Sequence, residues 1–275
     1  MLNQNLKKVL QEVTESSGRI TVLTGAGISA ESGIPTFRGP EGYWTIGAQE
    51  YHPQQMATLE MFKQKPDEVW KWYLYRMGVC AKAEPNAGHL ALVEIEKLFK
   101  NRFTLITQNV DNLHIRAGNR LQNTYQIHGN IFFMRCAAEC TVTVYPIPAE
   151  VAFKKKGEDL TENDRRMLVC PDCGKRTRPH VLWFDEIYNE GHYRYHSSLQ
   201  VAAETTLLIV VGTSGATNLP NQVARVVNQG GGIIVDINIE ENPFTHLALN
   251  SRRGFFFQAP SSLALPQILD ILRSP

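Results

Sequence analysis

The apolar positions of the chain follow two different periods, and each period predicts a different element. Within residues 1–17, Leu6, Val9 and Val13 recur at helical spacing. Four later runs are short and almost wholly apolar, which is typical of strands buried on both faces of a parallel sheet. These runs lie at residues 20–23, 103–107, 206–211 and 232–237, and helical patterns lie at about 66–80, 87–99 and 219–228. The alternation predicts an α/β fold, with helices on both faces of a parallel sheet.

Two stretches interrupt this alternation and predict a second, smaller module. Residues 43–100 are rich in Trp, Tyr and Met and look helical, whereas residues 133–177 carry cysteines, prolines and a lysine run. We therefore expect a Rossmann-like domain made of residues 1–42, 101–132 and 178–275. The smaller module would combine a helical insertion, 43–100, with a zinc-binding insertion, 133–177.

Charge and length narrow the class of protein. The 275 residues carry 28 basic and 27 acidic side chains, a formal net charge of +1. A nucleic-acid or acidic-membrane binder usually has a basic excess, so neither partner is expected. Apolar runs stay shorter than the roughly 18 residues that a membrane span needs. The first residues show neither an apolar signal core nor a transit pattern, and a cytoplasmic location is the expectation.

Four of the five cysteines form two close pairs. Cys136 and Cys140 make the first pair, Cys170 and Cys173 the second, and Cys80 stands alone. In an intracellular chain such pairs predict a metal site rather than disulfides. Four thiolates would close a tetrahedral zinc site with no open position for water, so the one zinc ion would be structural. The alternative is four unliganded thiols.

A glycine-rich turn follows the first predicted strand. Gly25, Ala26 and Gly27 begin a G-x-G-x-x-A pattern, in which exposed N–H groups can hold a pyrophosphate. Alone the pattern is a weak signal, because an ordinary tight turn has the same composition. The acidic residue expected about 20 positions further on is also missing, which argues against a common dehydrogenase.

Several longer motifs together are more specific. They are Glu31–Gly39, Thr107–His114, Ile127–Gly129, Gly212–Ser214, Asn238–Glu240 and the cysteine pairs. With them the chain resembles the sirtuin family of NAD-dependent protein deacylases, from residue 20 to about residue 262. The resemblance implies that NAD is a co-substrate. The acyl oxygen of a modified lysine attacks the nicotinamide ribose, and the products are free lysine, nicotinamide and an O-acyl-ADP-ribose.

The resemblance also implies roles for single residues. His128 is the expected catalytic base, since an imidazole accepts protons near neutral pH. Asn109 would position the ribose and a water, Asp111 would receive the carboxamide of nicotinamide, and Gln108 would bind ribose. The other expected cofactor contacts are Gly25, Ala26, Gly27, Glu31, Thr36, Phe37, Arg38, Val110, Gly212, Thr213, Ser214, Asn238, Ile239, Glu240 and Ser261.

One pair of residues predicts which acyl group is removed. Tyr73 and Arg76 lie three apart on a predicted helix and share one face, where a phenol and a guanidinium make a carboxylate receptor. The pair, with the small Ala57, resembles the sirtuin branch that removes succinyl, malonyl and glutaryl groups. An amphipathic helix also produces this spacing by chance.

The peptide is expected to lie against residues 180–186. Val181, Trp183 and Phe184 resemble the family segment that pairs with substrate backbone, but Asp185 stands where the family typically has glycine. Acyl-lysine proteins or peptides are therefore the expected partners of a monomeric chain. The rival functions are a dehydrogenase, a zinc-stabilised binding module, a mono-ADP-ribosyltransferase and a plain deacetylase.

Overall fold

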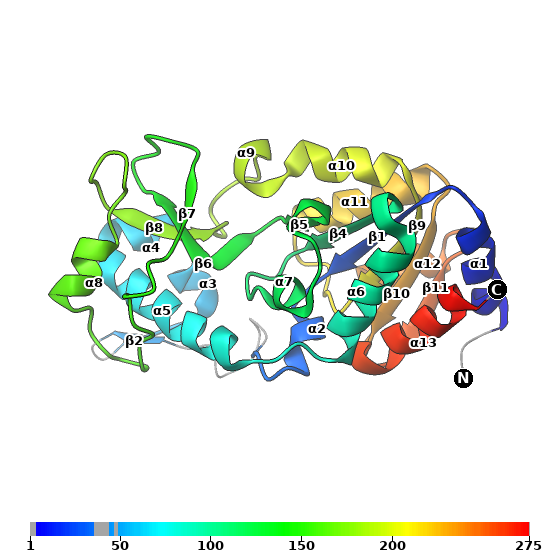
Figure 1. Ribbon diagram of the computed structural model, residues 1–275, viewed down its shortest axis with the longest axis horizontal. Coiled ribbons are helices and arrows are strands. Elements are labelled where there is room, and N and C mark those ends of the chain that lie inside the picture. Colours follow the sequence, from blue (N-terminus) through cyan, green and yellow to red (C-terminus); the bar gives the residue numbers. More distant parts are fainter. Residues whose placement is uncertain (1–3, 36–43, 47–48, 275) are drawn as a thin grey trace.

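The computed structural model describes residues 4–35, 44–46 and 49–274, and its largest element is a six-stranded parallel sheet (Figure 1). The strands, in their order across the sheet, are β11 (Phe255–Gln258), β10 (Ile233–Asn238), β9 (Thr205–Val211), β1 (Arg19–Thr24), β4 (Phe103–Thr107) and β5 (Thr124–Gln126). The four predicted strands are confirmed as β1, β4, β9 and β10. The edge strands β5 and β11 were not predicted, because they are short and only partly buried.

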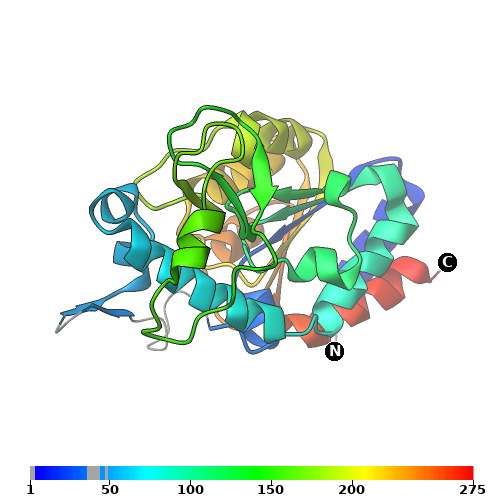
Figure 2. The ribbon, with the colours of Figure 1, turned by 60° about the vertical axis from the view of Figure 1, so that its left-hand side comes forward.

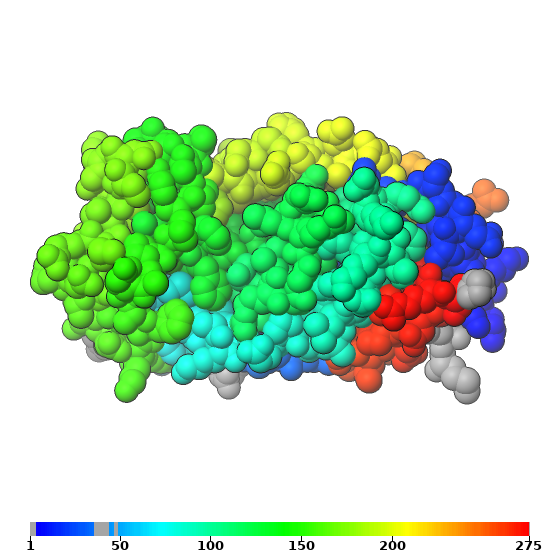
Figure 3. Space-filling view, viewed as in Figure 1, coloured from blue at the N-terminus to red at the C-terminus, as the bar shows by residue number. Residues whose placement is uncertain are grey.

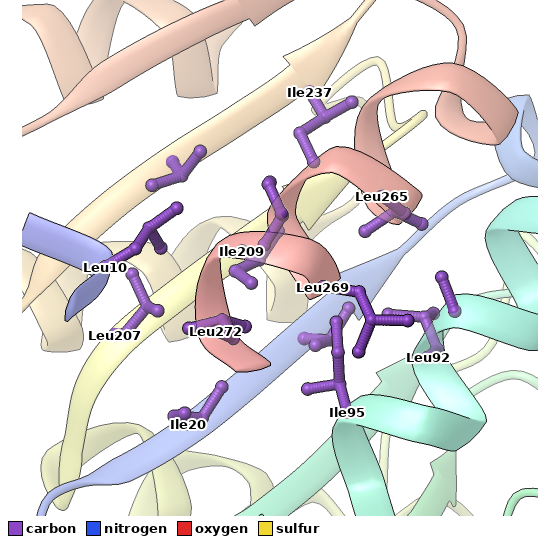
Figure 4. Packing of buried hydrophobic residues seen from close by; sticks show 14 of the residues in the cluster. Leu10, Ile20, Leu92, Ile95, Leu207, Ile209, Ile237, Leu265, Leu269 and Leu272 are labelled. Carbon is purple, nitrogen blue, oxygen red and sulfur yellow. The ribbon is translucent and has the colours of Figure 1, made fainter. Parts of the chain in front are cut away.

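Helices cover both faces of the sheet, and the predicted fold class is therefore confirmed. One face packs against α1 (Gln4–Glu15), α6 (Ala87–Phe99) and α13 (Ser261–Arg273). The other packs against α10 (Tyr195–Ala203), α11 (Asn218–Gln229) and α12 (Pro243–Leu249). Figure 4 shows Leu92 and Ile95 of α6 beside Leu269 of α13, over the strands. Since α6 packs on this sheet, the stretch 43–100 contributes to both parts of the molecule.

The smaller module lies at one end of the molecule, as Figures 1 and 2 show. Its elements are the hairpin β2 (Trp44–Ile46) and β3 (Gln49–Tyr51), the helices α3 (Pro53–Met56), α4 (Leu59–Gln64), α5 (Pro66–Lys82) and α8 (Glu162–Met167), and a three-stranded antiparallel sheet of β7 (Val144–Pro146), β6 (Gly129–Cys136) and β8 (Thr177–Val181). In the space-filling view of Figure 3, this module and the C-terminal helix α13 occupy opposite ends.

The remaining helical elements are short. They are α2 (Gly27–Ala30), η2 (Lys100–Arg102), α7 (Leu113–Ala117), η3 (Leu121–Asn123) and α9 (Glu190–Tyr193). The chain runs outward from β1 first to β4 and β5, then crosses to β9, β10 and β11. At such a reversal, open α/β sheets bind ligands in a crevice beyond the carboxyl ends of the two strands, which here are β1 and β9. Among the described helices, none combines the length and the apolarity needed to cross a membrane.

Candidate active site

Two glycine-containing turns meet at the crevice beyond β1 and β9. The Gly25 N–H donates to the Val211 carbonyl at 2.9 Å, and the Gly27 N–H donates to the Gly212 carbonyl at 2.7 Å. A Cβ atom built on Gly27 would lie 2.7 Å from the Cα of Gly212. Gly212 itself has a φ of +58°, which favours glycine. These glycines therefore let the two turns pack backbone against backbone, and two of their N–H groups are used in that contact.

A polar cluster lies directly after β4. Asn109 donates through its side-chain amide to the Gly25 carbonyl at 3.0 Å and to the Ser29 hydroxyl at 3.1 Å. Ser29 in turn donates to Asp111 at 2.7 Å. Gln108 reaches the neighbouring strand end and donates to the Thr213 hydroxyl at 2.9 Å. The structure thus brings Gln108, Asn109 and Asp111 together with the glycine turn, at the sheet edge where the sequence placed them.

Asp111 is a buried carboxyl group with a perturbed titration. Burial raises its pKa, while hydrogen bonds from the Leu113 N–H and the Ser29 hydroxyl, and the positive charge of Arg76, oppose the rise. Arg76, on α5, is therefore one of the charges that act on Asp111. A cation from the predicted acyl pocket thus acts electrostatically on a carboxylate from the predicted nicotinamide pocket.

His128 lies between β5 and β6, next to the same crevice. Its Nε2 atom is 2.7 Å from the Tyr188 hydroxyl, and its ring also hydrogen bonds to the backbone of Gln108. Burial lowers the pKa of His128 to about 4, whereas the contact with Gln108 works in the opposite direction. The imidazole is therefore neutral at physiological pH and able to accept a proton.

The expected adenosine contacts lie at the ends of β9 and β10. Asn238 donates to the Thr213 carbonyl at 3.0 Å, so it ties the two strand ends together. The side chains of Ser214, Ile239 and Glu240 are exposed beside it. Gly212, Thr213 and Asn238 thus meet at one edge, with three accessible side chains available to a ligand.

Glu31 has partners within the protein. It accepts hydrogen bonds from the hydroxyl of Ser261 at 2.8 Å and from both the backbone and the hydroxyl of Ser262. Burial alone would raise the pKa of Glu31, but these hydrogen bonds lower it. Glu31 and Ser261 therefore anchor the start of α13 against the turn after α2. The remaining expected cofactor contacts Thr36, Phe37 and Arg38 lie outside the described residues.

The residues predicted for acyl binding gather in the core of the smaller module. Ala57, Tyr73, Val181 and Trp183 belong to one buried cluster, and Val110 from the cofactor side joins it. The Trp183 indole donates to the Tyr73 hydroxyl at 2.9 Å. Burial raises the pKa of Tyr73 despite the nearby charge of Arg76, so its phenol stays protonated and can donate to a ligand.

The segment after β8 is fastened to the start of α4. The Phe184 N–H donates to the Ala57 carbonyl at 3.0 Å, and Asp185 accepts from the N–H groups of Leu59 at 2.7 Å and Glu60 at 3.1 Å. The carboxylate therefore caps the positive end of α4. Asp185, the departure from the family pattern, links two walls of the predicted peptide site. The side chain of Phe184 is exposed there.

The four paired cysteines come together in the smaller module. All four Sγ atoms lie within 4.8 Å of one another, and the Cys136–Cys173 and Cys140–Cys170 distances are both 3.6 Å. A disulfide requires about 2.05 Å. Tetrahedral zinc with bonds of about 2.3 Å separates its sulfur ligands by roughly 3.8 Å, so the four thiols fit one structural zinc ion. Cys80 is buried elsewhere, beside Leu113.

Two residues at this site were missed by the sequence interpretation. Ser29 contacts both Asn109 and Asp111, and its signal was available, because it follows the glycine turn directly. Tyr188 contacts His128 from 60 residues further along the chain. It belongs to none of the motifs, so only the tertiary structure identifies it.

Known proteins resemble this chain over nearly its whole length. The Sir2 family profile matches residues 25–218. A protein named NAD-dependent protein deacylase from Leptospira interrogans is 36% identical over 98% of this chain and 100% of its own length. Proteins with the same name from Pyrococcus furiosus and Thermus thermophilus are 35% and 39% identical, covering 96% and 87% of this chain and 97% and 87% of their own.

Solved structures agree with these relatives. A crystal structure of a Sir2 homolog–NAD complex has a TM-score of 0.80 and 31% identity, covering 99% of this chain and 94% of that one. A Sir2–p53 peptide–NAD⁺ structure has a TM-score of 0.75 and 25% identity, covering 98% of each chain. This chain belongs to the Sir2 family. The expectation of an NAD-dependent protein deacylase is confirmed at the level of that family, and the specific acyl group is a separate question.

Proposed function

We propose that this chain is a protein-lysine deacylase that uses NAD to remove acyl groups ending in a carboxylate: succinyl, malonyl and glutaryl. Acetyl-lysine would be a weaker substrate. One observation carries the proposal: Tyr73, which is held protonated, shares a buried cluster with Ala57, and Arg76 acts electrostatically on both Tyr73 and Asp111. A phenol donor and a guanidinium fork are matched to a distal carboxylate.

The polar cluster after β4 supports the cofactor side of the proposal. NAD, when bound, supplies the ribose that receives the acyl group. Asp111 would hold the nicotinamide carboxamide, Asn109 and Gln108 would orient the ribose, and Ser29 would fix the side chains of Asn109 and Asp111. His128 would take a proton from a ribose hydroxyl at Nε2, because burial keeps its imidazole neutral.

The acyl-lysine peptide would lie between the two parts of the molecule. Val181 and Trp183 are buried beside Tyr73, and the exposed Phe184 offers an apolar surface for a peptide side chain. A protein with a TM-score of 0.75 to this chain is named as a complex with p53 peptide and NAD⁺. A zinc ion held by the four cysteines would stabilise the smaller module without entering the reaction.

The preference for one acyl group is tested by measuring turnover of succinyl-lysine and acetyl-lysine peptides in the presence of NAD. Arg76→Met keeps the apolar stem and removes the fork. A hydrogen bond to a charged group contributes roughly 1.5–3 kcal/mol, so kcat/KM for the succinyl peptide should fall about ten- to a few-hundredfold. Turnover of the acetyl peptide should change far less, because acetyl carries no charge. The measurement is nicotinamide release with each peptide.

A conservative variant sharpens the test. Arg76→Lys keeps the positive charge without the planar fork, so its succinyl activity should lie between those of Arg76→Met and the unmodified chain. Equal losses on the two peptides, or a preference of the unmodified chain for acetyl-lysine, would make this a plain deacetylase. Transfer of labelled ADP-ribose to protein without deacylation would favour the ADP-ribosyltransferase instead.

A further inference from the structure

The phenol of Tyr188 contacts the expected base directly. Its hydroxyl lies 2.7 Å from Nε2 of His128, and the two rings are 5.8 Å apart at a tilt of 33°. Tyr188 follows the peptide-binding segment, two residues after Glu186.

The surroundings hold the Tyr188 ring in place. It packs against the buried cluster between the sheet and α11, and it stacks on Tyr195 with centroids 6.4 Å apart. Burial raises the pKa of Tyr188, although a hydrogen bond with Thr217 opposes the rise. The phenol is therefore protonated at neutral pH, and it reaches His128 from a fixed direction.

Tyr188 also joins His128 to the strand ends that form the cofactor crevice. Thr217 contacts the phenol and donates its own hydrogen to Oε1 of Gln108 at 2.8 Å. The amide group of Gln108 then donates to Thr213 at 2.9 Å. One hydrogen bond therefore links Nε2 of His128 to Tyr188, and two others link Thr217 and Gln108 to the ends of β4 and β9, with Thr217 acting on the phenol between them.

We propose that Tyr188 is a positioning residue for His128, which keeps Nε2 hydrogen bonded before and after proton transfer. This proposal rests on the proposed role of His128 as base. While the imidazole is neutral, the phenol O–H donates to Nε2. Nε2 has a single lone pair, so the substrate hydroxyl displaces the phenol from it while the proton is transferred. Once the substrate oxygen has moved away, the Nε2 N–H donates to the phenol oxygen, and the phenol hydrogen turns to Thr217. Neither state leaves a buried polar atom unpaired at this contact, which would be costly.

The test compares two tyrosines of the same stacked pair. Tyr188→Phe removes the hydroxyl beside His128 and keeps the ring. Tyr195→Phe is the matched control, because its hydroxyl donates to Gln222 at 3.1 Å and does not touch His128. We expect kcat of Tyr188→Phe to fall about five- to tenfold, with KM values for NAD and peptide within about twofold, because one hydrogen bond that orients the base is lost. Tyr195→Phe should keep both parameters.

A second measurement does not depend on turnover. The side-chain ¹⁵N resonance of Nε2 of His128, assigned by its absence from His128→Gln, should move toward that of an unpaired nitrogen in Tyr188→Phe and stay in place in Tyr195→Phe. An unchanged resonance would overturn the proposal. So would an unchanged kcat, or a higher kcat/KM for NAD, which would mean that Tyr188 only covers the base.

The variant His128→Ala distinguishes an error in the role of His128 from an error in the role of Tyr188. If folded His128→Ala keeps full turnover, His128 is not the base, and the positioning role of Tyr188 falls with it. If His128→Ala is inactive while Tyr188→Phe matches the unmodified chain, the base assignment stands and only the role of Tyr188 is overturned.

Discussion

The large sheet and the smaller module are stabilised by different means. The sheet buries mainly aliphatic side chains between its strands and two layers of helices, so each residue has many replaceable partners. The smaller module has one aromatic cluster, and charged groups are buried around it, among them Arg135, Arg178 and the pair of Lys154 with Asp164 at 2.7 Å. Four cysteines add a metal site.

This difference predicts where single substitutions will change the stability of the protein most. A small unit buries a smaller share of its surface and needs additional links, such as metals, for stability. When a substitution removes one partner of a buried ion pair or one ligand of the metal, the remaining groups are left as uncompensated buried charges or thiolates. We therefore expect large losses from polar substitutions in the smaller module. In the sheet, the buried carboxyl group of Asp236 should behave in the opposite way.

Loss of the zinc site should reduce the stability of the protein most. Cys170→Ser replaces a buried ligand of the Cys₄ cluster. Zinc binding to small domains contributes on the order of 10 kcal/mol to folding, so the variant should lose about one zinc per chain, and residues 133–177 should become sensitive to protease. The measurements are metal content and limited proteolysis.

Cys80→Ala is the matched control for that experiment. It also removes a buried thiol, but one outside the cluster, and should cost about 1 kcal/mol while the metal is retained. A metal-free Cys170→Ser protein with the protease pattern of the unmodified chain would show that the module does not need zinc.

Removal of the negative charge of Glu186 should have the second largest effect on stability. Glu186 accepts from Arg178 at 2.5 and 2.7 Å, and that guanidinium lies 3.4 Å from the centre of the Trp183 ring. Glu186→Gln keeps the shape but leaves Arg178, which is almost fully buried, without its anion. Breaking a buried pair in this way costs about 3–5 kcal/mol. Urea unfolding should show the loss as a lower midpoint.

The exposed Glu139 provides the comparison for Glu186. It lies 3.4 Å from Arg135, a cation that Glu186 also contacts, but its side chain is 74% exposed. Glu139→Gln should therefore cost less than about 1 kcal/mol. Similar losses from both variants would mean that burial does not set the energy of these pairs.

In the sheet, we expect substitution of one buried carboxyl group to increase the stability of the protein, by a smaller amount. Asp236 on β10 is fully buried, and burial raises its pKa to about 6, although Thr245 and Asn242 donate to it. The ordinary value is 3.8. The protonated carboxyl contributes its full stability below about pH 4, and that stability is lost as the pH rises toward 6. Above pH 6 the charged group therefore destabilises the fold by a constant amount.

Asp236→Asn should remove that penalty. At pH 7.5 the variant should be more stable than the unmodified chain by on the order of 2–3 kcal/mol, and at pH 4 the two should differ little. Thermal unfolding at the two pH values measures the difference. A variant that is destabilised equally at both would show that the hydrogen bonds from Thr245 and Asn242 require the carboxylate.

The features of this protein that depend on local pattern could be predicted from the amino-acid sequence. Continuous apolar runs predicted the four central strands, because a strand buried on both faces allows no polar position. The paired cysteines and the polar residues after β4 were also visible, since metal ligands and strand-end side chains are close in sequence. The glycine turn was predicted too, although its glycines also serve close backbone packing.

Contacts between residues that are distant along the chain could not be predicted in this way and are seen in the folded structure. The short edge strands β5 and β11 depend on their neighbours for pairing, and α6 joins the sheet because its apolar stripe matches α13. Asp185 fills a position that the sequence left open, since its carboxylate caps a helix that begins 126 residues earlier. Tyr188 reaches His128 across 60 residues. Such contacts arise from packing between elements, and no spacing along the chain encodes them.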